Sequence, residues 1–229
     1  MSITNIFCYF AFQSPFTMTD KNYLNDLNEI KDLMNRSSRF ISLSGLSGIL
    51  AGIYALIGAA YAYILLQNKT VYIRMQSAGN AELVLKLLVI AFTVALLAIV
   101  TAYILTRKQA LQNNERMWDQ TTKRMLVHFM IPLLTGGVFG LILLNHEHYG
   151  IMAPITLIFY GLALVNVSKF TLDTVKYLGI SEIIVGLSSA IYVGYGLFFW
   201  AFGFGVLHIV YGSVMYFKEG KLTAKARSR

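Results

Sequence analysis

The stretch that decides the fold is Ile183–Phe217, IIVGLSSAIYVGYGLFFWAFGFGVLHIVYGSVMYF, which runs for 35 residues without Asp, Glu, Lys or Arg. As one straight helix it would be about 52 Å long, whereas the hydrocarbon core of a bilayer is about 30 Å thick. As two helices it is slightly short, unless the first of them begins near Tyr177. Gly194-Tyr195-Gly196 supplies a turn between two such helices. The stretch therefore predicts either one very long span or two antiparallel spans.

The composition of the whole chain is that of a membrane protein. Of its 229 residues, 56% are hydrophobic and 13% are charged, whereas a soluble domain carries about 25% charged residues. The mean hydropathy is +0.60. This excludes an ordinary soluble enzyme and a disordered tail. The single cysteine, Cys8, excludes an intramolecular disulfide and a cysteine-rich zinc site.

Six apolar runs have the length of transmembrane helices. We expect an all-α, polytopic bundle with a membrane domain over residues 39–217, preceded by a cytoplasmic segment over residues 1–38 and followed by a basic cytoplasmic tail over residues 218–229. The predicted spans cover about residues 40–66, 83–105, 126–144, 150–167, 177–193 and 197–217.

The distribution of positive charge favours six spans over five. With six spans, the loops on one side carry sixteen of the 19 Lys and Arg residues: Lys21, Lys31, Arg36, Arg39, Arg107, Lys108, Arg116, Lys123, Arg124, Lys169, Lys176, Lys218, Lys221, Lys225, Arg227 and Arg229. The other side carries Lys69 and Arg74, and Lys86 lies inside the second span. Positive residues concentrate on the cytoplasmic side of membrane proteins, so both termini are predicted to be cytoplasmic. The net charge of +8 is thus explained by orientation and does not predict nucleic-acid binding.

The N-terminal segment contains two features. Residues 1–17 hold an apolar run without a preceding Lys or Arg, and Met18 begins a polar stretch, so translation is expected to start at Met18. Residues 20–38 predict a polar helix with an apolar stripe formed by Tyr23, Leu27, Ile30 and Met34. Such a helix packs against its own bundle, or it forms a dimerising or regulatory coiled coil.

Small residues at four-residue spacing predict close helix contacts. Ser44, Gly48 and Gly52 follow one another in the first span, and Gly136 and Gly140 repeat the spacing in the third. Small side chains let two backbones approach closely where lipid gives no hydrophobic drive between helices. Packing within one chain is the simpler interpretation, and assembly of a homo-oligomer is the alternative.

Two polar residues within the spans need a physical reason. Glu182 lies inside the fifth span and His208 near the middle of the sixth. An ionised carboxylate at the bilayer centre costs on the order of 2.5–3.5 kcal/mol, so Glu182 is expected to face the bundle and to contact His208. The contact is either a structural hydrogen bond or part of a proton or ion relay; in a third interpretation Glu182 simply lies in the interface between helices. Asn166 and His128 are candidate neighbours of this polar cluster.

No pattern in the sequence indicates an enzyme. The chain has no phosphate-binding loop, no dinucleotide fingerprint and no paired-carboxylate site, and its cytoplasmic segments are too short to hold one. His146, Glu147 and His148 could each bind a metal ion, but three consecutive residues do not converge easily on one ion. We therefore expect no catalytic residue, no cofactor and no metal site.

Three segments resemble a family of six-span integral membrane proteins found in Bacteroidetes, for which no activity is known. They are the run Asn28–Gly48, the run Leu157–Leu164, and the pair of runs Tyr195–Trp200 and Gly205–Ile209. The likeness covers about residues 20–217, and it implies a location in the bacterial inner membrane.

Two classes of function are compatible with these features. The first is a non-enzymatic sensor, regulator or scaffold, which binds the lipid bilayer and either a cytoplasmic protein or a second copy of itself. The second is a small transporter or channel with Glu182 and His208 on its path. Few polar side chains lie in the spans, and this favours the first class.

Overall fold

The computed structural model describes residues 44–67, 81–112, 118–171 and 173–227. The chain divides into two units, residues 1–37 and 38–229, and every described residue belongs to the second. The sequence-based expectations about the N-terminal helix, the start at Met18 and the loop that holds Lys69 and Arg74 lie outside the described residues.

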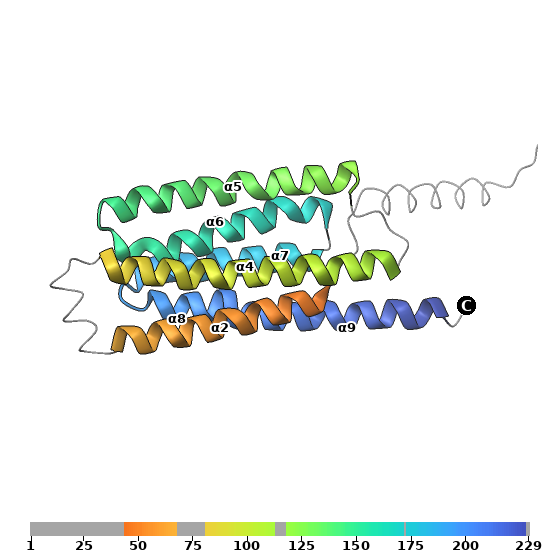
Figure 1. The fold of residues 1–229 in the computed structure, drawn as a ribbon. Helices are drawn as coiled ribbons and strands as arrows, with labels where there is room; N and C mark the ends of the chain where they lie inside the picture. The colour runs from red at the N-terminus through yellow and green to blue at the C-terminus, as the bar shows by residue number, and fades with distance from the viewer. Residues whose placement is uncertain (1–43, 68–80, 113–117, 172, 228–229) are drawn as a thin grey trace, which may run out of the picture. The chain divides into compact units, whose positions relative to one another are not determined.

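The described part of the chain is all-helical, and six of its helices are long and apolar enough to cross a membrane (Figure 1). This confirms the predicted all-α fold with six spans. The six are α2 (Gly45–Gln67), α4 (Ala81–Gln112), α5 (Gln120–Asn145), α6 (Met152–Val167, continued at its ends by the short η1, Tyr149–Ile151, and η2, Ser168–Phe170), α7 (Asp173–Ile191), and a sixth helix made of α8 (Gly196–Trp200), η3 (Ala201–Leu207) and α9 (His208–Arg227).

The long uncharged stretch divides into two helices, as the distribution of positive charge predicted. α7 ends at Ile191 and α8 begins at Gly196. Between them Gly194 has φ +97°, a left-handed backbone conformation that glycine adopts without steric cost. The predicted turn therefore lies where the sequence placed it.

Several helices extend beyond the predicted spans. α4 continues to Gln112 and α5 already begins at Gln120, because Asp119 caps its first turn by accepting a hydrogen bond from the backbone N–H of Thr122 at 2.7 Å. The extensions are polar. Hydropathy marks the residues suited to lipid, whereas capping residues and helix propensity set where the helix itself ends.

Two pairs of helices are joined by close backbone contact. α2 packs along the sixth helix, where a Cβ atom on Gly48 would lie 3.2 Å from Gly212 Cα and one on Gly52 would lie 2.6 Å from the Gly205 carbonyl oxygen. Buried Ser44 begins this contact face, and its carbonyl accepts a hydrogen bond from Ser47 Oγ at 2.6 Å. The small residues of the first span thus meet a helix of the same chain.

The second close pair is α6 and α7. A Cβ atom on Gly161 would lie 2.6 Å from the Gly179 carbonyl oxygen, and one on Gly179 would lie 2.7 Å from the Gly161 carbonyl oxygen. The two glycines therefore face each other across the contact. A side chain on either one would push the two backbones apart.

The outer helices, α4 and α5, are packed less closely. α4 packs mainly along α2, where the Tyr54 and Thr101 hydroxyl groups lie 3.3 Å apart. α5 packs mainly along α6, and Gly136 gives room there to the ring of Phe159. Gly140, the second small residue of the predicted pair with Gly136, is not in close contact. A Cβ atom there would have Met152 Sδ as its nearest neighbour, at 4.0 Å. Gly140 faces a looser part of the α5–α6 contact.

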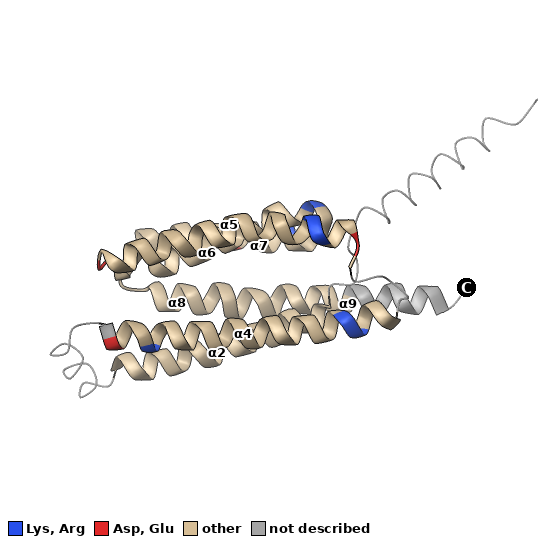
Figure 2. Ribbon diagram, turned by 45° about the horizontal axis from the view of Figure 1, so that its top comes forward, with Lys and Arg blue, Asp and Glu red and all other residues tan. Residues whose placement is uncertain are grey.

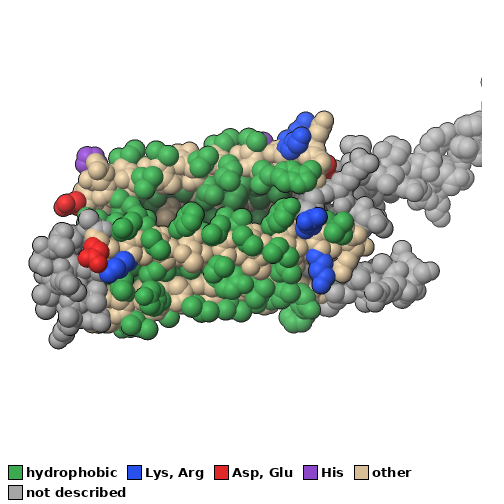
Figure 3. Space-filling model, in the orientation of Figure 1, with side chains coloured by type: hydrophobic (Ala, Val, Ile, Leu, Met, Phe, Trp, Pro, Cys, Tyr) green, Lys and Arg blue, Asp and Glu red, His purple; other side chains and the backbone are tan. Residues whose placement is uncertain are grey.

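The surface of the bundle suits a bilayer. Large apolar side chains are exposed along its length, for example Phe92 on α4 and Leu134 on α5, with exposed fractions of 70% and 62% (Figure 3). Among the described residues, basic side chains gather where α4 ends and α5 begins and where α6 ends and α7 begins: Arg107, Lys108, Lys123, Arg124, Lys169 and Lys176. At the opposite end of α4, Lys86 is paired with Glu82 at 2.8 Å (Figure 2).

Candidate functional site

Glu182 is a fully buried acidic residue in the middle of α7, with an exposed fraction of 0%. It shares a helix face with Gly179 and Gly186, which lie about one turn before and one turn after it. Both glycines bring the backbone of α7 against α6, and a Cβ atom on Gly186 would lie 3.0 Å from the backbone nitrogen of Ile158. This close packing removes water from the Glu182 side chain.

The Glu182 carboxyl group rests against Gly203 of the sixth helix. A Cβ atom at Gly203 would lie 2.5 Å from Glu182 Oε2 and 2.5 Å from Leu157 Cδ2, so only glycine leaves room for the carboxyl group. Gly203 belongs to η3, a π-helical segment over Ala201–Leu207. Single π-helical turns inside α-helices occur frequently at functional sites, and this one lies directly against the buried acid.

His208 follows the π-helical segment and connects the helices through both of its ring nitrogens. Nδ1 lies 3.1 Å from the Gly203 carbonyl oxygen and 3.3 Å from Glu182 Oε1. Because a carbonyl oxygen only accepts hydrogen bonds, we assign a hydrogen to Nδ1. In the neutral imidazole, Nε2 then accepts a hydrogen bond from the Tyr160 hydroxyl group at 2.8 Å.

Tyr160 brings α6 into the site. Its ring packs edge-on against Phe129 of α5 and lies 5.0 Å from the ring of Phe204 on the sixth helix. We call Glu182, His208, Tyr160 and Gly203 the polar network. The network joins α6, α7 and the sixth helix. The sequence did not single out Tyr160, because nothing in its neighbourhood distinguishes it from the other thirteen tyrosines of the chain's 14.

The carboxyl group of Glu182 is under-satisfied. Neither Oε1 nor Oε2 has a hydrogen-bond partner among the described residues, although His208 Nδ1 is close enough to Oε1 for electrostatic contact. Leaving a buried polar group unpaired costs about 1–3 kcal/mol, and such a group in a native structure calls for a reason. The pair can hold one proton in two ways, as a neutral acid beside neutral imidazole or as a carboxylate beside imidazolium.

A second polar contact lies next to the network. Ser181 Oγ and the Tyr211 hydroxyl group are 3.1 Å apart, and they also link α7 to the sixth helix. Ser189, two turns beyond Glu182 on α7, is 1% exposed, and its hydroxyl group has no hydrogen-bond partner among the described residues. Polar groups therefore line the α7 face over several turns.

Asn166 and His128 do not join the network. Asn166 Nδ2 donates a hydrogen bond to the His128 backbone carbonyl at 2.9 Å, and His128 Nδ1 lies 2.7 Å from the Arg124 carbonyl. The expectation that these two side chains extend the Glu182 cluster is corrected here. Their contact joins α5 to the end of α6, because Asn166 comes nearly two turns after Tyr160 on α6.

His146, Glu147 and His148 lie in the turn between α5 and α6, where Glu147 has φ +61°. Within the described ranges, no three His, Cys, Asp or Glu side chains come together in a way that could hold a metal ion.

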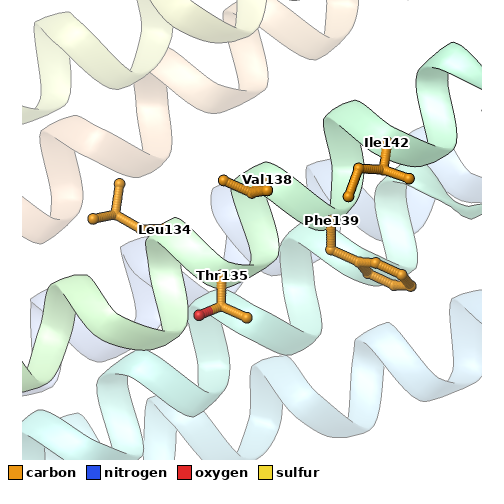
Figure 4. Close-up of a pocket in the computed structure, with 5 residues that line it drawn as sticks. All are labelled: Leu134, Thr135, Val138, Phe139 and Ile142. Atoms are coloured by element: carbon orange, nitrogen blue, oxygen red, sulfur yellow. The ribbon is translucent and has the colours of Figure 1, made fainter.

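A hollow on the surface of α5 has a different character. It encloses about 470 Å³ and is lined by Leu134, Thr135, Val138, Phe139 and Ile142, all on successive turns of one helix (Figure 4). Its lining is almost wholly apolar, and the Thr135 hydroxyl group is already bonded to the Ile131 carbonyl at 2.8 Å. The hollow offers no charged or free polar group to a ligand.

Comparison of the chain with models of protein families, with curated proteins and with solved structures finds no match in any of the three. The function proposed below is supported by the geometry of the polar network and by the arrangement of charge.

Proposed function

We propose that this chain is a non-enzymatic sensor or regulator embedded in the bacterial inner membrane, with both termini in the cytoplasm and the polar network as its sensing element. The observation that carries the proposal is the burial of Glu182, whose two carboxyl oxygens lack hydrogen bonds among the described residues, between two closely packed helix pairs. A buried carboxyl group whose hydrogen-bonding capacity is only partly used can exist in two states of similar free energy. A sensor requires such a pair of states.

The position of the network supports sensing more than transport. α2 is fitted to the sixth helix, and α6 to α7, by glycine contacts that leave no space. The network lies between these two pairs. At its centre, Glu182 Oε2 and Leu157 Cδ2 already fill the space around Gly203, so no solute fits beside the carboxyl group.

A second candidate is a proton-conducting or proton-coupled transporter. It is favoured by one observation, the chain of contacts from the Tyr160 hydroxyl group through both His208 nitrogens to Glu182. Imidazole between a hydroxyl group and a carboxyl group can accept a proton on one nitrogen and release another from the second.

Proteoliposomes separate these two functions. The purified protein, reconstituted with a potassium diffusion potential and an internal pH dye, should pass no more protons than protein-free liposomes do. Glu182→Gln should give the same trace as the natural chain. A proton flux above that of empty liposomes, lost in Glu182→Gln, would contradict the sensor proposal and support the transporter.

The orientation is supported by the basic side chains at the ends of α4, α5, α6 and α7, since positive residues stay on the cytoplasmic side. Cysteine is introduced at Lys123 or at His148, two exposed positions at opposite ends of α5, in a Cys8→Ser background. On intact spheroplasts an impermeant maleimide should label His148→Cys and should label Lys123→Cys only after permeabilisation. The reverse pattern would show that both termini face outward.

A further inference from the structure

The π-helical turn and the buried acid lie in direct contact, and the Nδ1–H group of His208 lies close to both. His208 Nδ1–H faces two acceptors, the Gly203 carbonyl oxygen at 3.1 Å and Glu182 Oε1 at 3.3 Å. The carbonyl belongs to the π-helical segment, and the carboxyl group belongs to α7. A change that strengthens one acceptor withdraws the hydrogen from the other.

We infer that Glu182 is a proton-binding switch whose ionisation converts the π-helical turn of the sixth helix into regular α-helix. The ligand is a proton exchanged with the aqueous phase. The inference deepens the proposed function, on which it rests, because it names the stimulus and the moving part of the same network.

With the proton on Glu182, the carboxyl group is neutral and a weak acceptor, and His208 Nδ1–H stays on the Gly203 carbonyl oxygen, which lies 3.1 Å from Nδ1. When the proton leaves for water, the carboxylate becomes the stronger acceptor, since hydrogen bonds to ionised groups are about twice as strong. Nδ1–H then turns to Oε1. The π-helical turn then loses the side-chain hydrogen bond to its Gly203 carbonyl group.

Without that side-chain bond, regular α-helix is favoured over the π-helical turn, which is the rarer geometry. A π-helix bonds each carbonyl to the N–H group five residues on, and an α-helix bonds it to the N–H group four residues on. Removing one π turn rotates the flanking helix by about 100° and shifts it by about 1.5 Å, which is the step of one residue. Glu182 Oε2, Leu157 and Leu56 lie against Gly203 and Gly205, so these neighbours have to move with the turn.

Few other titratable groups face Glu182. Tyr160 comes from α6 and His208 from the sixth helix, while Tyr211 is bonded to Ser181. α2 and α8 contain no Asp, Glu, Lys, Arg or His. On α7 itself, Asp173 and Lys176 lie near its first turn, more than one turn from Glu182.

The two tryptophans of the chain allow a direct test. Trp200 precedes the π-helical segment and packs against Phe204, with ring centroids 5.0 Å apart, whereas Trp118 lies before α5 and is 62% exposed. The full chain is labelled with 5-fluorotryptophan and studied by fluorine NMR in lipid nanodiscs between acidic and alkaline buffer. Trp118→Phe assigns the two signals.

We expect the Trp200 signal to move with pH in the natural chain and the Trp118 signal to stay in place. Glu182→Gln, which cannot ionise, should hold the Trp200 signal at its acidic position in every buffer. Glu147→Gln, a matched change in the exposed turn after α5, should behave like the natural chain. A Trp200 signal that does not move in the natural chain, or that moves equally in Glu182→Gln, would overturn the switch.

Hydrogen exchange of the natural chain keeps the test decisive if Glu182→Gln does not fold. After correction for intrinsic rates, the amides of residues 201–207 should exchange several-fold more slowly in alkaline buffer, and equal protection at both pH values would overturn the switch. Failure of the switch in either experiment can be distinguished from failure of the proposed function, because the proposed function fails only if the liposomes show a proton flux. A chain without flux and without a Trp200 response would remain a candidate sensor of another stimulus.

Discussion

Gly161→Ala is expected to lower the free energy of unfolding by about 1–3 kcal/mol, the usual range for overpacking a tight contact. A methyl group at this position would lie 2.6 Å from the Gly179 carbonyl oxygen and 3.0 Å from the backbone nitrogen of Ile183. Both atoms belong to the backbone of α7, so they cannot rotate away as a flexible side chain would. The whole of α7 would have to move away from α6.

Gly137→Ala is the matched control for this change. Gly137 also lies inside a membrane helix, but a Cβ atom there would have no neighbour within 4 Å. Since alanine favours helix by about 1 kcal/mol over glycine, this variant should be neutral or slightly more stable. Unfolding in mixed micelles titrated with a denaturing detergent measures both. Equal effects of the two substitutions would show that α6 and α7 are not in close contact.

His208→Leu is expected to cost about 3 kcal/mol, because it leaves two buried groups without their partner. The Tyr160 hydroxyl group loses its acceptor at 2.8 Å, and Glu182 loses its neighbour at 3.3 Å. Glu182→Gln should be tolerated, since glutamine has nearly the same shape and keeps a carbonyl oxygen that can face His208. Glu182→Leu should cost less than His208→Leu, at most about 1 kcal/mol, because the carboxyl group that it removes has no hydrogen bond among the described residues.

A double-mutant cycle decides whether the two residues act together. Removing both polar groups in Glu182→Leu with His208→Leu should cost less than the sum of the single changes, by about 1 kcal/mol. Thr156→Val provides a control, because its hydroxyl group bonds only its own helix, at 3.0 Å from the Met152 carbonyl. A coupling energy of zero between Glu182 and His208 would reject the polar network as a functional unit.

The sixth helix makes two kinds of contact. Through Gly205 and Gly212 it fits closely against α2, and through His208 it contacts α6 and α7 by polar groups. A change in the π-helical turn would therefore move α2 together with the sixth helix. The polar contacts to α6 and α7 would break and form again in a new arrangement. This division explains how a change at one buried proton could alter the relation between two tightly packed helix pairs.

The positions of the spans followed from the sequence, because a segment that crosses lipid must be apolar over its whole length and internally hydrogen-bonded. The same length constraint singled out Glu182, since six crossings leave no room for it outside the membrane. The turn at Gly194 and the close contacts of Gly48 and Gly52 could also be predicted, because their signals are local and periodic.

The partners of these residues were decided only by the tertiary structure. Tyr160, Gly203 and the facing pair Gly161 and Gly179 come from different helices, and which of them meet depends on rotation and crossing of those helices. When a helix is apolar on all sides, its hydropathy pattern does not show how the helix is rotated about its own axis. No periodic pattern therefore marks its inner face. The π-helical turn is equally hidden, because it arises from how Ala201–Leu207 pack around a buried carboxyl group on another helix.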